Sequence, residues 1–286
     1  MSAVVDRFQC LQCASPDAHS KYQRVPDRFH GFPGEFTYVT CAQCGLVQHE
    51  HVPPNLGAFY TGYRVHTGDS LLYRVLRRLT IGHCYLGAQG EGKALLDIGC
   101  GNGFYLKQMA GKGWQPTGYE FDPEYAATLS QQIELPVIAG EQTLAEHEGR
   151  FDLVTFNFSF EHLDRPVQFL ELAARALRPG GQIYIAVPNI ESREAAVFGS
   201  RWFHLDPPRH VSFFTKAHLR AQLERLGFTD VKVKNLAIPT GFAGSISYRL
   251  WNRFQGATWY AGIIPGLLFS LFVRDGNFAI SARRRA

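Results

Sequence analysis

The amino-acid sequence predicts an α/β fold with a mostly parallel sheet and a small cysteine-containing module at its N-terminus. An apolar strand ends in a glycine-rich loop at residues 95–103, and strand and helix patterns alternate from there to about residue 190. Two Cys-x-x-Cys pairs precede this region. Strands that alternate with amphipathic helices form parallel sheets. With 286 residues the chain has room for one large domain and one small module.

The glycine-rich loop predicts a nucleotide-cofactor site. Residues 95–103 read Leu-Leu-Asp-Ile-Gly-Cys-Gly-Asn-Gly, and residues 104–110 can follow as a helix with free amides at its start. Glycine allows the backbone to turn tightly and to approach a ligand closely. Glu120 ends the next apolar stretch, at a distance where a carboxylate can accept hydrogen bonds from both ribose hydroxyls.

Two classes of cofactor compete for this pattern. A dinucleotide loop has the spacing Gly-x-Gly-x-x-Gly after an uncharged strand, whereas this loop has alternate glycines that follow an acid. That acid would repel a pyrophosphate but attract a cationic head such as the amino group of S-adenosylmethionine (SAM). The loop therefore resembles that of class I SAM-dependent methyltransferases. The residues concerned are Asp97, Gly99, Gly101 and Gly103.

The resemblance continues over roughly residues 91–190. Residues 151–157 are similar to the family's fourth strand, and a helix with one apolar face follows from about Asp164, which can act as its N-cap. The turn at residues 177–181 ends this helix. Apolar side chains then alternate in a strand at residues 183–187.

The resemblance implies a seven-stranded Rossmann-like SAM-methyltransferase sheet over residues 91–286, with residues 277–282 as its antiparallel last strand. Ahead of that strand, Thr215 can cap a helix that ends at Gly227, and residues 230–235 alternate as a half-exposed strand. SAM is the implied cofactor. Its implied contacts are Asp97, Gly99, Gly101, Gly103, Glu120, Phe121 and Asn157.

The cysteine spacing predicts a structural zinc site. Two knuckles can each present two thiolates to one tetrahedral Zn²⁺, and a strand at residues 36–40 leads into the second knuckle, which Gly45 follows. A redox or disulfide role is the alternative, and a reducing compartment disfavours it. Cys84 and Cys100 lack metal-like spacing and are expected to be small buried apolar residues. The predicted ligands are Cys10, Cys13, Cys41 and Cys44.

This zinc-ribbon module, residues 1–62, resembles the N-terminal module of bacterial sugar C-methyltransferases, which carries two Cys-x-x-Cys pairs and a Tyr-x-x-Tyr-like stretch. Tyr60 and Tyr63 take that place here, where a lid would meet the catalytic domain. His49 and His51 could be ligands or bases, but four sulfurs already satisfy zinc, so we expect both on the surface of a strand.

Three further segments complete the predicted organisation. Residues 63–90 form a linker whose arginine-bearing amphipathic helix is expected to pack on the sheet, with membrane contact as the alternative. Insertions at about 190–214 and 237–275 are expected to cover the substrate. Within the second, residues 254–273 carry no charge, but Pro265-Gly266 breaks the run, so we expect an apolar helical insertion over the acceptor pocket or a dimer face. Membrane association is again the alternative.

The segment 201–214 is the predicted centre of acceptor chemistry. It contains two histidines, an aspartate and two arginines, and it resembles a Trp-x-x-x-x-Pro-Pro-Arg-His block of bacterial methyltransferases linked to glycan or small-molecule modification. In-line methyl transfer to a hydroxyl or carbon acid requires removal of a proton, which suits histidine. As an alternative, Asp206 and Arg209 simply pair and His210 caps a strand. The candidate bases are His204, His210 and then His162, with Tyr60 or Tyr63 as orienting residues.

We therefore expect a SAM-dependent methyltransferase that acts on a small molecule or glycan: a sugar, nucleotide sugar or lipid-linked saccharide. The alternatives are a zinc-ribbon-guided RNA methyltransferase and a non-catalytic SAM-fold scaffold. Residues 36–62 contain no Lys or Arg and the net charge is only +4, which disfavours RNA, while the intact loop disfavours a scaffold. Because no secretory signal is evident, we expect a cytoplasmic protein, with peripheral contact to the inner membrane as an option.

Overall fold

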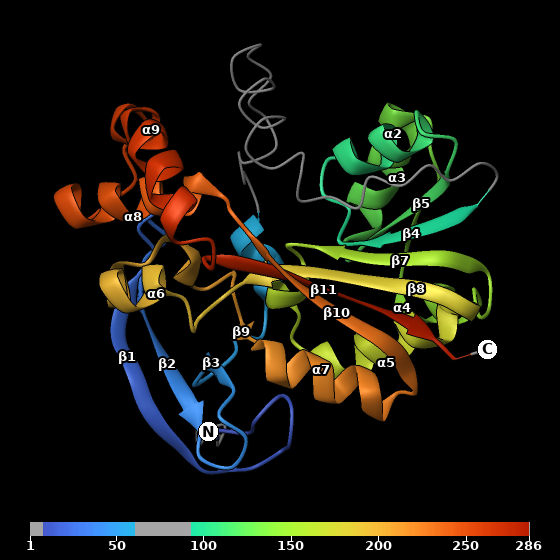
Figure 1. Ribbon diagram of the computed structural model, residues 1–286, viewed down its shortest axis with the longest axis horizontal. Coiled ribbons are helices and arrows are strands. Elements are labelled where there is room, and N and C mark those ends of the chain that lie inside the picture. Colours follow the sequence, from blue (N-terminus) through green and yellow to red (C-terminus); the bar gives the residue numbers. More distant parts are fainter. Residues whose placement is uncertain (1–7, 61–92, 286) are drawn as a thin grey trace, which may run out of the picture.

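The computed structural model describes residues 8–60 and 93–285, which form two sheets (Figure 1). The larger sheet has seven strands in the order β10-β11-β8-β7-β4-β5-β6, and β11 runs antiparallel to both neighbours. This architecture confirms the predicted fold class. Its strands are β4 (Ala94–Ile98), β5 (Gln115–Glu120), β6 (Val137–Ala139), β7 (Phe151–Asn157), β8 (Leu177–Pro188), β10 (Phe228–Leu236) and β11 (Asn277–Arg284).

Helices cover both faces of this sheet (Figure 1). One face carries α2 and α3, and the other carries α5 and α7. Because consecutive parallel strands diverge on either side of β4, its carboxyl end lies at the topological switch point, where ligands bind in such sheets. The helices are α2 (Phe104–Ala110), α3 (Pro123–Ile133), α4 (Glu141–Ala145), α5 (Pro166–Ala176) and α7 (Lys216–Arg225).

The helix boundaries confirm one predicted cap and correct another. Thr215 accepts a hydrogen bond from the His218 amide at 3.2 Å, so the predicted cap of α7 is confirmed. Helix α5, in contrast, begins at Pro166 and not at Asp164, and its N-cap residue Arg165 makes no side-chain cap bond. Proline favours the first helical position because its φ angle is already helical and it has no amide proton to satisfy.

The smaller sheet combines three strands of the N-terminal module with one strand of the large domain. It has the order β1-β2-β3-β9, and β3 pairs Val47 with Phe213 and Gln48 with Ser212. Cys41 and Leu46 pack in the same apolar core as Phe214 of the large domain. The N-terminal sheet therefore requires a strand from the segment that follows β8. Its strands are β1 (Ala18–Pro26), β2 (Glu35–Cys41), β3 (Val47–His49) and β9 (Ser212–Phe213).

Short helices surround the carboxyl ends of β7 and β8. They are η1 (Leu56–Tyr60), η3 (Phe160–His162), α6 (Arg193–Phe198), η4 (Gly199–Arg201) and η5 (Phe203–Leu205). Two longer helices, α8 (Pro239–Trp251) and α9 (Gly256–Phe272), form a hairpin beside them (Figure 1). The rings of Phe242 and Phe269 stack at 4.4 Å between the two helices.

Helix α9 corrects one prediction from the sequence, because it continues through Pro265 instead of breaking there. Gly266 explains how this segment stays packed on α8: a Cβ added to it would lie 2.7 Å from the Pro239 carbonyl oxygen. Among the described residues, no helix has both the length and the apolar character needed to cross a membrane. Large exposed apolar side chains of this hairpin are Leu250, Trp251, Tyr260, Ile264, Leu267, Leu268 and Phe272.

Candidate active site and metal centre

The glycine-rich loop joins the end of β4 to α2 in the predicted arrangement. Gly99, Gly101 and Gly103 all have positive φ angles, of 74°, 58° and 71°. A Cβ added to Gly99 would lie 2.5 Å from the Ser159 Cβ, so this position has no room for a side chain. The loop therefore brings its backbone close to the segment that follows β7, which is the geometry a bound cofactor needs.

Asp97 lies buried directly below this loop, with 2% of its surface exposed. Thr155 Oγ1 and Asn157 Nδ2 both donate to its Oδ1 atom, at 2.6 and 2.8 Å. Burial raises the pKa of Asp97 to about 7, and these two hydrogen bonds only partly offset that cost. A bound cation would stabilise the ionised form, so the site suits an ammonium group.

Glu120 lies at the end of β5 and bonds to the same loop. Its Oε1 atom accepts a hydrogen bond from the Gly101 amide at 2.5 Å, and burial raises its pKa to about 7. Phe121, the next residue, is 46% exposed and its ring contacts Phe169 at 5.3 Å. The structure thus brings together all seven residues for which we predicted cofactor contacts. An exposed aromatic ring beside a buried carboxylate can pack on a base while the carboxylate receives hydroxyl groups.

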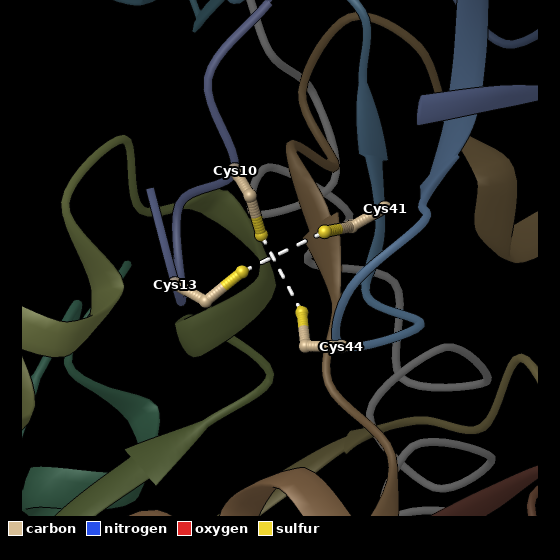
Figure 2. Close-up of side chains that lie close together, drawn as sticks. All are labelled: Cys10, Cys13, Cys41 and Cys44. Carbon is tan, nitrogen blue, oxygen red and sulfur yellow. Dashed lines mark hydrogen bonds between the residues drawn. The ribbon is translucent and has the colours of Figure 1, made fainter. Parts of the chain in front are cut away.

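The four cysteines of the N-terminal module converge on one point (Figure 2). The sulfurs of Cys10 and Cys44 lie 3.5 Å apart, and those of Cys13 and Cys41 lie 3.6 Å apart. Tetrahedral zinc with bonds of about 2.3 Å holds its sulfurs about 3.8 Å apart. These two distances are close to that value, and all four sulfurs lie within 4.8 Å of one another, so the cluster suits such an ion.

Polar contacts hold both knuckles in this orientation. Gln48 of β3 accepts from the Leu11 amide at 2.8 Å and donates to the Gln9 carbonyl at 3.1 Å. His218 of α7 places its Nε2 atom 2.8 Å from the Cys44 carbonyl oxygen. The cluster of four cysteines is therefore held both by its own sheet and by the large domain.

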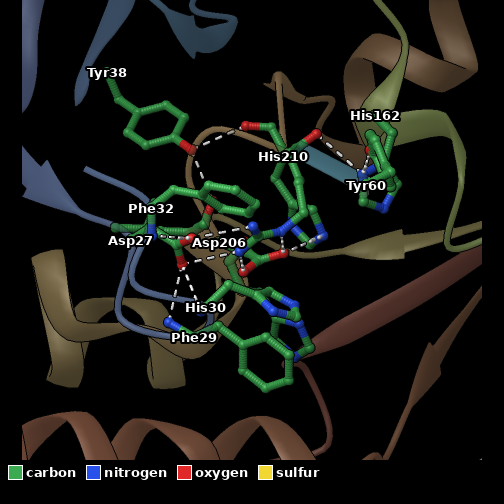
Figure 3. A network of polar contacts seen from close by, with 12 residues as sticks. Asp27, Phe29, His30, Phe32, Tyr38, Tyr60, His162, Asp206 and His210 are labelled. Atoms are coloured by element: carbon green, nitrogen blue, oxygen red, sulfur yellow. Dashed lines mark hydrogen bonds and ion pairs between the residues drawn. The ribbon is translucent and has the colours of Figure 1, made fainter. Parts of the chain in front are cut away.

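The three histidines that we predicted as candidate bases lie close together, and Figure 3 shows two of them, His162 and His210. His210 Nδ1 lies 2.7 Å from the His204 carbonyl oxygen. His162 Nδ1 lies 3.0 Å from the Arg209 carbonyl oxygen and 2.7 Å from the Tyr60 hydroxyl, and the rings of His162 and His210 meet edge to face at 4.5 Å. The predicted meeting of Tyr60 with a histidine of the large domain is present.

Burial keeps these imidazoles neutral. It lowers the pKa of His162 to about 4 and that of His204 to about 4, and it lowers the pKa of His210 well below its ordinary value. A neutral imidazole carries one N–H group and one lone pair, so each ring can donate with one nitrogen and accept with the other.

A buried ion triad holds this histidine cluster in place (Figure 3). Arg209 has no exposed surface, and it donates to both Asp27 oxygens at 3.0 and 3.1 Å and to the Asp206 oxygens at 2.6 and 3.0 Å. The predicted alternative, an ion pair between Asp206 and Arg209, is confirmed. The sequence analysis did not identify Asp27 as a further partner of Arg209. Asp27 comes from the loop after β1, where its carboxylate also accepts from the Phe29 and His30 amides.

Two predictions about histidines are wrong. His49 is 1% exposed instead of lying on the surface, because its ring stacks on Tyr38 at 4.3 Å inside the small sheet, whereas His51 is exposed. His210 does not cap a strand, since its Nδ1 atom contacts the His204 carbonyl. Tyr63, Cys84 and the linker helix lie outside the described residues.

Glu161 is the main residue that the sequence analysis did not select. It is 2% exposed, and neither carboxylate oxygen has a hydrogen-bond partner among the described residues. Burial raises its pKa to about 8. Its place directly before His162, at the end of a buried strand, is a signal that could have identified it.

Comparison with known proteins places this geometry in a family. Residues 71–233 match a family model described as a methyltransferase domain, which is more than half of the chain. The chain belongs to this methyltransferase family. The chain therefore carries a methyltransferase domain, in agreement with the predicted enzyme class.

The methyltransferase is similar to proteins named ubiquinone biosynthesis O-methyltransferase. One from Aromatoleum aromaticum is 29% identical over 143 residues, which are 47% of this chain and 61% of the relative. One from Pseudomonas aeruginosa is 32% identical over 134 residues, which are 44% of this chain and 58% of the relative. The chain spans about three fifths of the length of these curated relatives.

Solved structures share the fold of the methyltransferase. A SAM-dependent methyltransferase from Archaeoglobus fulgidus covers 79% of this chain and all of its own, with a TM-score of 0.54 at 21% identity. The phosphoethanolamine N-methyltransferase 2 of Haemonchus contortus with bound SAM covers 79% of this chain and 60% of its own, with a TM-score of 0.53 at 16% identity. At these identities the likeness concerns the fold alone.

Proposed function

We propose that this methyltransferase transfers a methyl group from SAM to a small polar acceptor: a sugar, a nucleotide sugar or a lipid-linked saccharide. The supporting observation is a set of buried polar side chains with atoms that lack a hydrogen-bond partner among the described residues. Each such atom costs about 1–3 kcal/mol unless a ligand satisfies it. A hydroxyl-rich acceptor would do so. The side chains are those of Asn157, Glu161, His204, Tyr248 and Asn277.

Three of these residues lie near the carboxyl ends of the parallel strands, where sheets of this kind bind ligands. Asn157 ends β7, Glu161 follows it in η3, and Asn277 begins β11 opposite Pro188 at the end of β8. An acceptor seated there would lie beside the cofactor loop, because β7 neighbours β4. A purely apolar acceptor would leave these atoms unsatisfied, which is why we favour a polar one.

In this proposal the two buried carboxylates bind the cofactor. Asp97 receives the amino group of SAM, and Glu120 accepts hydrogen bonds from its ribose hydroxyls. The glycines at 99, 101 and 103 let the backbone approach the cofactor, Phe121 packs on the adenine, and Asn157 orients Asp97 through their 2.8 Å hydrogen bond. The raised pKa values of Asp97 and Glu120 support these roles, since a bound ammonium and hydroxyl donors replace the lost solvation.

We assign the general base to His162. His204 is a weaker candidate because α8 covers it: a Cβ on Gly241 would lie 2.4 Å from its Nε2 atom. His210 is buried behind the ion triad, whereas His162 is half-buried. We assign the proton of His162 to Nδ1, which then donates to the Arg209 carbonyl and to the oxygen of the Tyr60 hydroxyl, and the lone pair to Nε2.

The chemical step is then an in-line displacement. The acceptor atom forms its new bond to the methyl carbon as the carbon–sulfur bond of SAM breaks, which leaves S-adenosylhomocysteine. His162 Nε2 takes the acceptor proton, and Tyr60 and the Arg209 carbonyl hold the ring by its other nitrogen. Tyr63 is proposed to assist Tyr60 from the same stretch. The names of the curated relatives favour oxygen as the acceptor atom.

We also propose that the four cysteines bind one structural Zn²⁺ and that residues 1–62 act as a lid on the acceptor side. The sulfur spacing and the Tyr60 contact support this proposal. The linker (residues 63–90), the catalytic domain (residues 91–286) and its two substrate-covering insertions complete the proposed organisation. A lipid-linked acceptor could lay its chain on the exposed apolar side chains of α9.

The test is methyl transfer from labelled SAM to a panel of nucleotide sugars, glycans and lipid-linked saccharides. We expect turnover with a member of this panel and a fall in kcat of about 10²–10⁴-fold in His162→Gln, with SAM affinity within twofold of the parent. His147→Gln is the matched control, because that histidine stacks on Phe151 at the start of β7, the opposite end of this strand from Asn157. Unchanged turnover in His162→Gln would remove the base assignment. Turnover only with quinone-like phenols would remove the polar-acceptor proposal.

A further inference from the structure

A second cluster of metal-ligating side chains lies in the large domain, apart from the four cysteines. A ring nitrogen of His162, a ring nitrogen of His210 and a carboxylate oxygen of Glu161 all lie within 4.8 Å of one another. Nothing in the methyl-transfer step requires three such groups to converge. We propose that they form a binding site for one divalent transition-metal ion, and that the bound ion switches off proton transfer by His162.

The ligand set is one that transition metals use. Two imidazoles and one carboxylate are typical of sites for ions such as Fe²⁺, Co²⁺ and Zn²⁺ and leave further coordination positions open. Metal bonds of about 2.1 Å hold such donors roughly 3.0–3.4 Å apart. The three donor atoms lie within 4.8 Å of one another, so small side-chain rotations are enough to bring them to these separations.

The hydrogen bonds of both histidines prepare them as ligands. His162 Nδ1 lies 3.0 Å from one backbone carbonyl, that of Arg209, and His210 Nδ1 lies 2.7 Å from another, that of His204. The carbonyl contact of His210 needs a proton on Nδ1 and leaves the lone pair on Nε2. For His162 we assign the same tautomer, in which Nδ1–H is shared between the Arg209 carbonyl and the oxygen of the Tyr60 hydroxyl at 2.7 Å. Histidines that bind metals usually donate their other N–H to a carbonyl or carboxylate in this way, which sets the tautomer and the ring direction.

Glu161 supplies the independent observation. Its carboxyl group is buried, and neither oxygen has a hydrogen-bond partner among the described residues. Glu194, the other buried glutamate of this region, differs because its Oε1 atom accepts from the Trp202 indole at 3.1 Å. A buried carboxyl without partners is costly, and a metal ion bonded to an oxygen would remove that cost.

The same lone pair cannot serve a metal and a proton at once. In the proposed function, His162 Nε2 takes the acceptor proton; when an ion occupies this nitrogen, the base is lost. The regulatory part of the inference thus rests on the proposed function, while metal binding itself does not. The ion would hinder the acceptor and leave the cofactor loop around Asp97 unchanged.

The first experiment titrates Co²⁺ into protein whose cysteine site already holds one zinc, confirmed by elemental analysis. We expect one equivalent of Co²⁺ to bind with visible d–d bands of nitrogen and oxygen ligands and without thiolate charge-transfer bands. Glu161→Gln should weaken this binding at least tenfold, and Glu194→Gln, the matched buried glutamate, should stay within twofold. SAM affinity serves as the check that each variant folds. No binding, or equal binding in both variants, would overturn the site.

A measurement on the unaltered protein tests the metal site even if the Glu161→Gln variant does not fold. The proton NMR spectrum of the cobalt form should contain two strongly shifted, exchangeable resonances, one from each Nδ1–H group of the two histidine ligands. Their absence would contradict ligation by this pair, whatever the behaviour of Glu161→Gln.

The second experiment measures methyl transfer with added Zn²⁺ or Co²⁺. We expect inhibition that is competitive with the acceptor but not with SAM, and a concentration for half inhibition at least tenfold higher in Glu161→Gln, relative to that variant's own metal-free rate. Activation by the ion would overturn the regulatory part. If no acceptor is turned over, the proposed function fails, but the cobalt spectra still decide whether the metal site exists.

Discussion

The cofactor edge and the acceptor edge of this methyltransferase are built in different ways. The cofactor edge consists of one continuous segment from β4 to the end of β5, plus the end of β7. The acceptor edge joins residues from four distant parts of the chain: the loop after β1, η1, η3 and the segment around η5. A local motif can specify the first edge, whereas the second exists only once the whole chain is folded.

The two edges also differ in their charged residues. At the cofactor edge, Asp97 is buried and Glu120 is half-buried, neither forms an ion pair among the described residues, and desolvation raises the pKa of each to about 7. At the acceptor edge, Arg209 is clamped between Asp27 and Asp206 with no exposed surface. In the proposed function a cationic ligand completes the first edge, whereas the second already holds its own cation, Arg209. Three predictions test this contrast.

The largest expected effect is loss of the zinc centre. The N-terminal module that contains the four cysteines shares an apolar core with the large domain, so we expect both to unfold together. Structural zinc contributes on the order of 10 kcal/mol of binding free energy in small zinc domains. Cys44→Ser should therefore lose its zinc and lower the free energy of unfolding by several kcal/mol in a single transition.

Elemental analysis and calorimetric unfolding measure this effect. Cys100→Ser, at the cofactor edge, is the control and should keep one zinc per chain. Two separate unfolding transitions in Cys44→Ser, with SAM binding unchanged, would show that residues 1–62 fold independently of the catalytic domain.

The next effect concerns the ion triad. Arg209→Met should lower the free energy of unfolding by about 3–5 kcal/mol, because it leaves two buried carboxylates without their cation. Arg165→Met is the matched control: its partner Glu141 lies at the surface, Arg165 is 52% exposed, and the change should stay within about 1 kcal/mol. Urea unfolding of both variants measures the difference. Equal effects would mean that the triad does not hold the acceptor edge together.

The smallest effect is the pH dependence of SAM binding. Burial raises the pKa of Asp97 to about 7, so the free protein is mostly protonated there at pH 6 and mostly ionised at pH 8. Because the cofactor ammonium needs the ionised form, affinity should rise roughly tenfold from pH 6 to pH 8, and binding at pH 7 should release a proton.

Titration calorimetry in buffers of different ionisation enthalpy measures that proton. Asp97→Asn should bind SAM more weakly and lose this part of the pH dependence, while Asp122→Asn, a helix cap at the surface, should retain it. The opposite trend, with tighter binding at pH 6, would mean that Asp97 does not pair with the amino group.

Interpretation of the sequence succeeded where the chemistry is local. The loop glycines and the helix at residues 104–110 follow from patterns within a few residues, and the structure confirms them. The antiparallel last strand, which the family resemblance implied, is also present. It failed where packing decided the outcome. His49 alternates like a surface residue but is buried by Tyr38, and Pro265 stays within a helix because α8 packs beside it.

The sequence by itself determined the fold class, the cofactor loop and the cysteine spacing, because each depends on neighbours along the chain. Only the tertiary structure decided that Asp27 joins Arg209, that β9 completes the N-terminal sheet and that Glu161 meets two histidines. The physical reason is that such contacts are made by burial and pairing between segments far apart in the chain. Neither periodicity nor a short motif in the sequence predicts which distant charged residue or strand a given segment will contact.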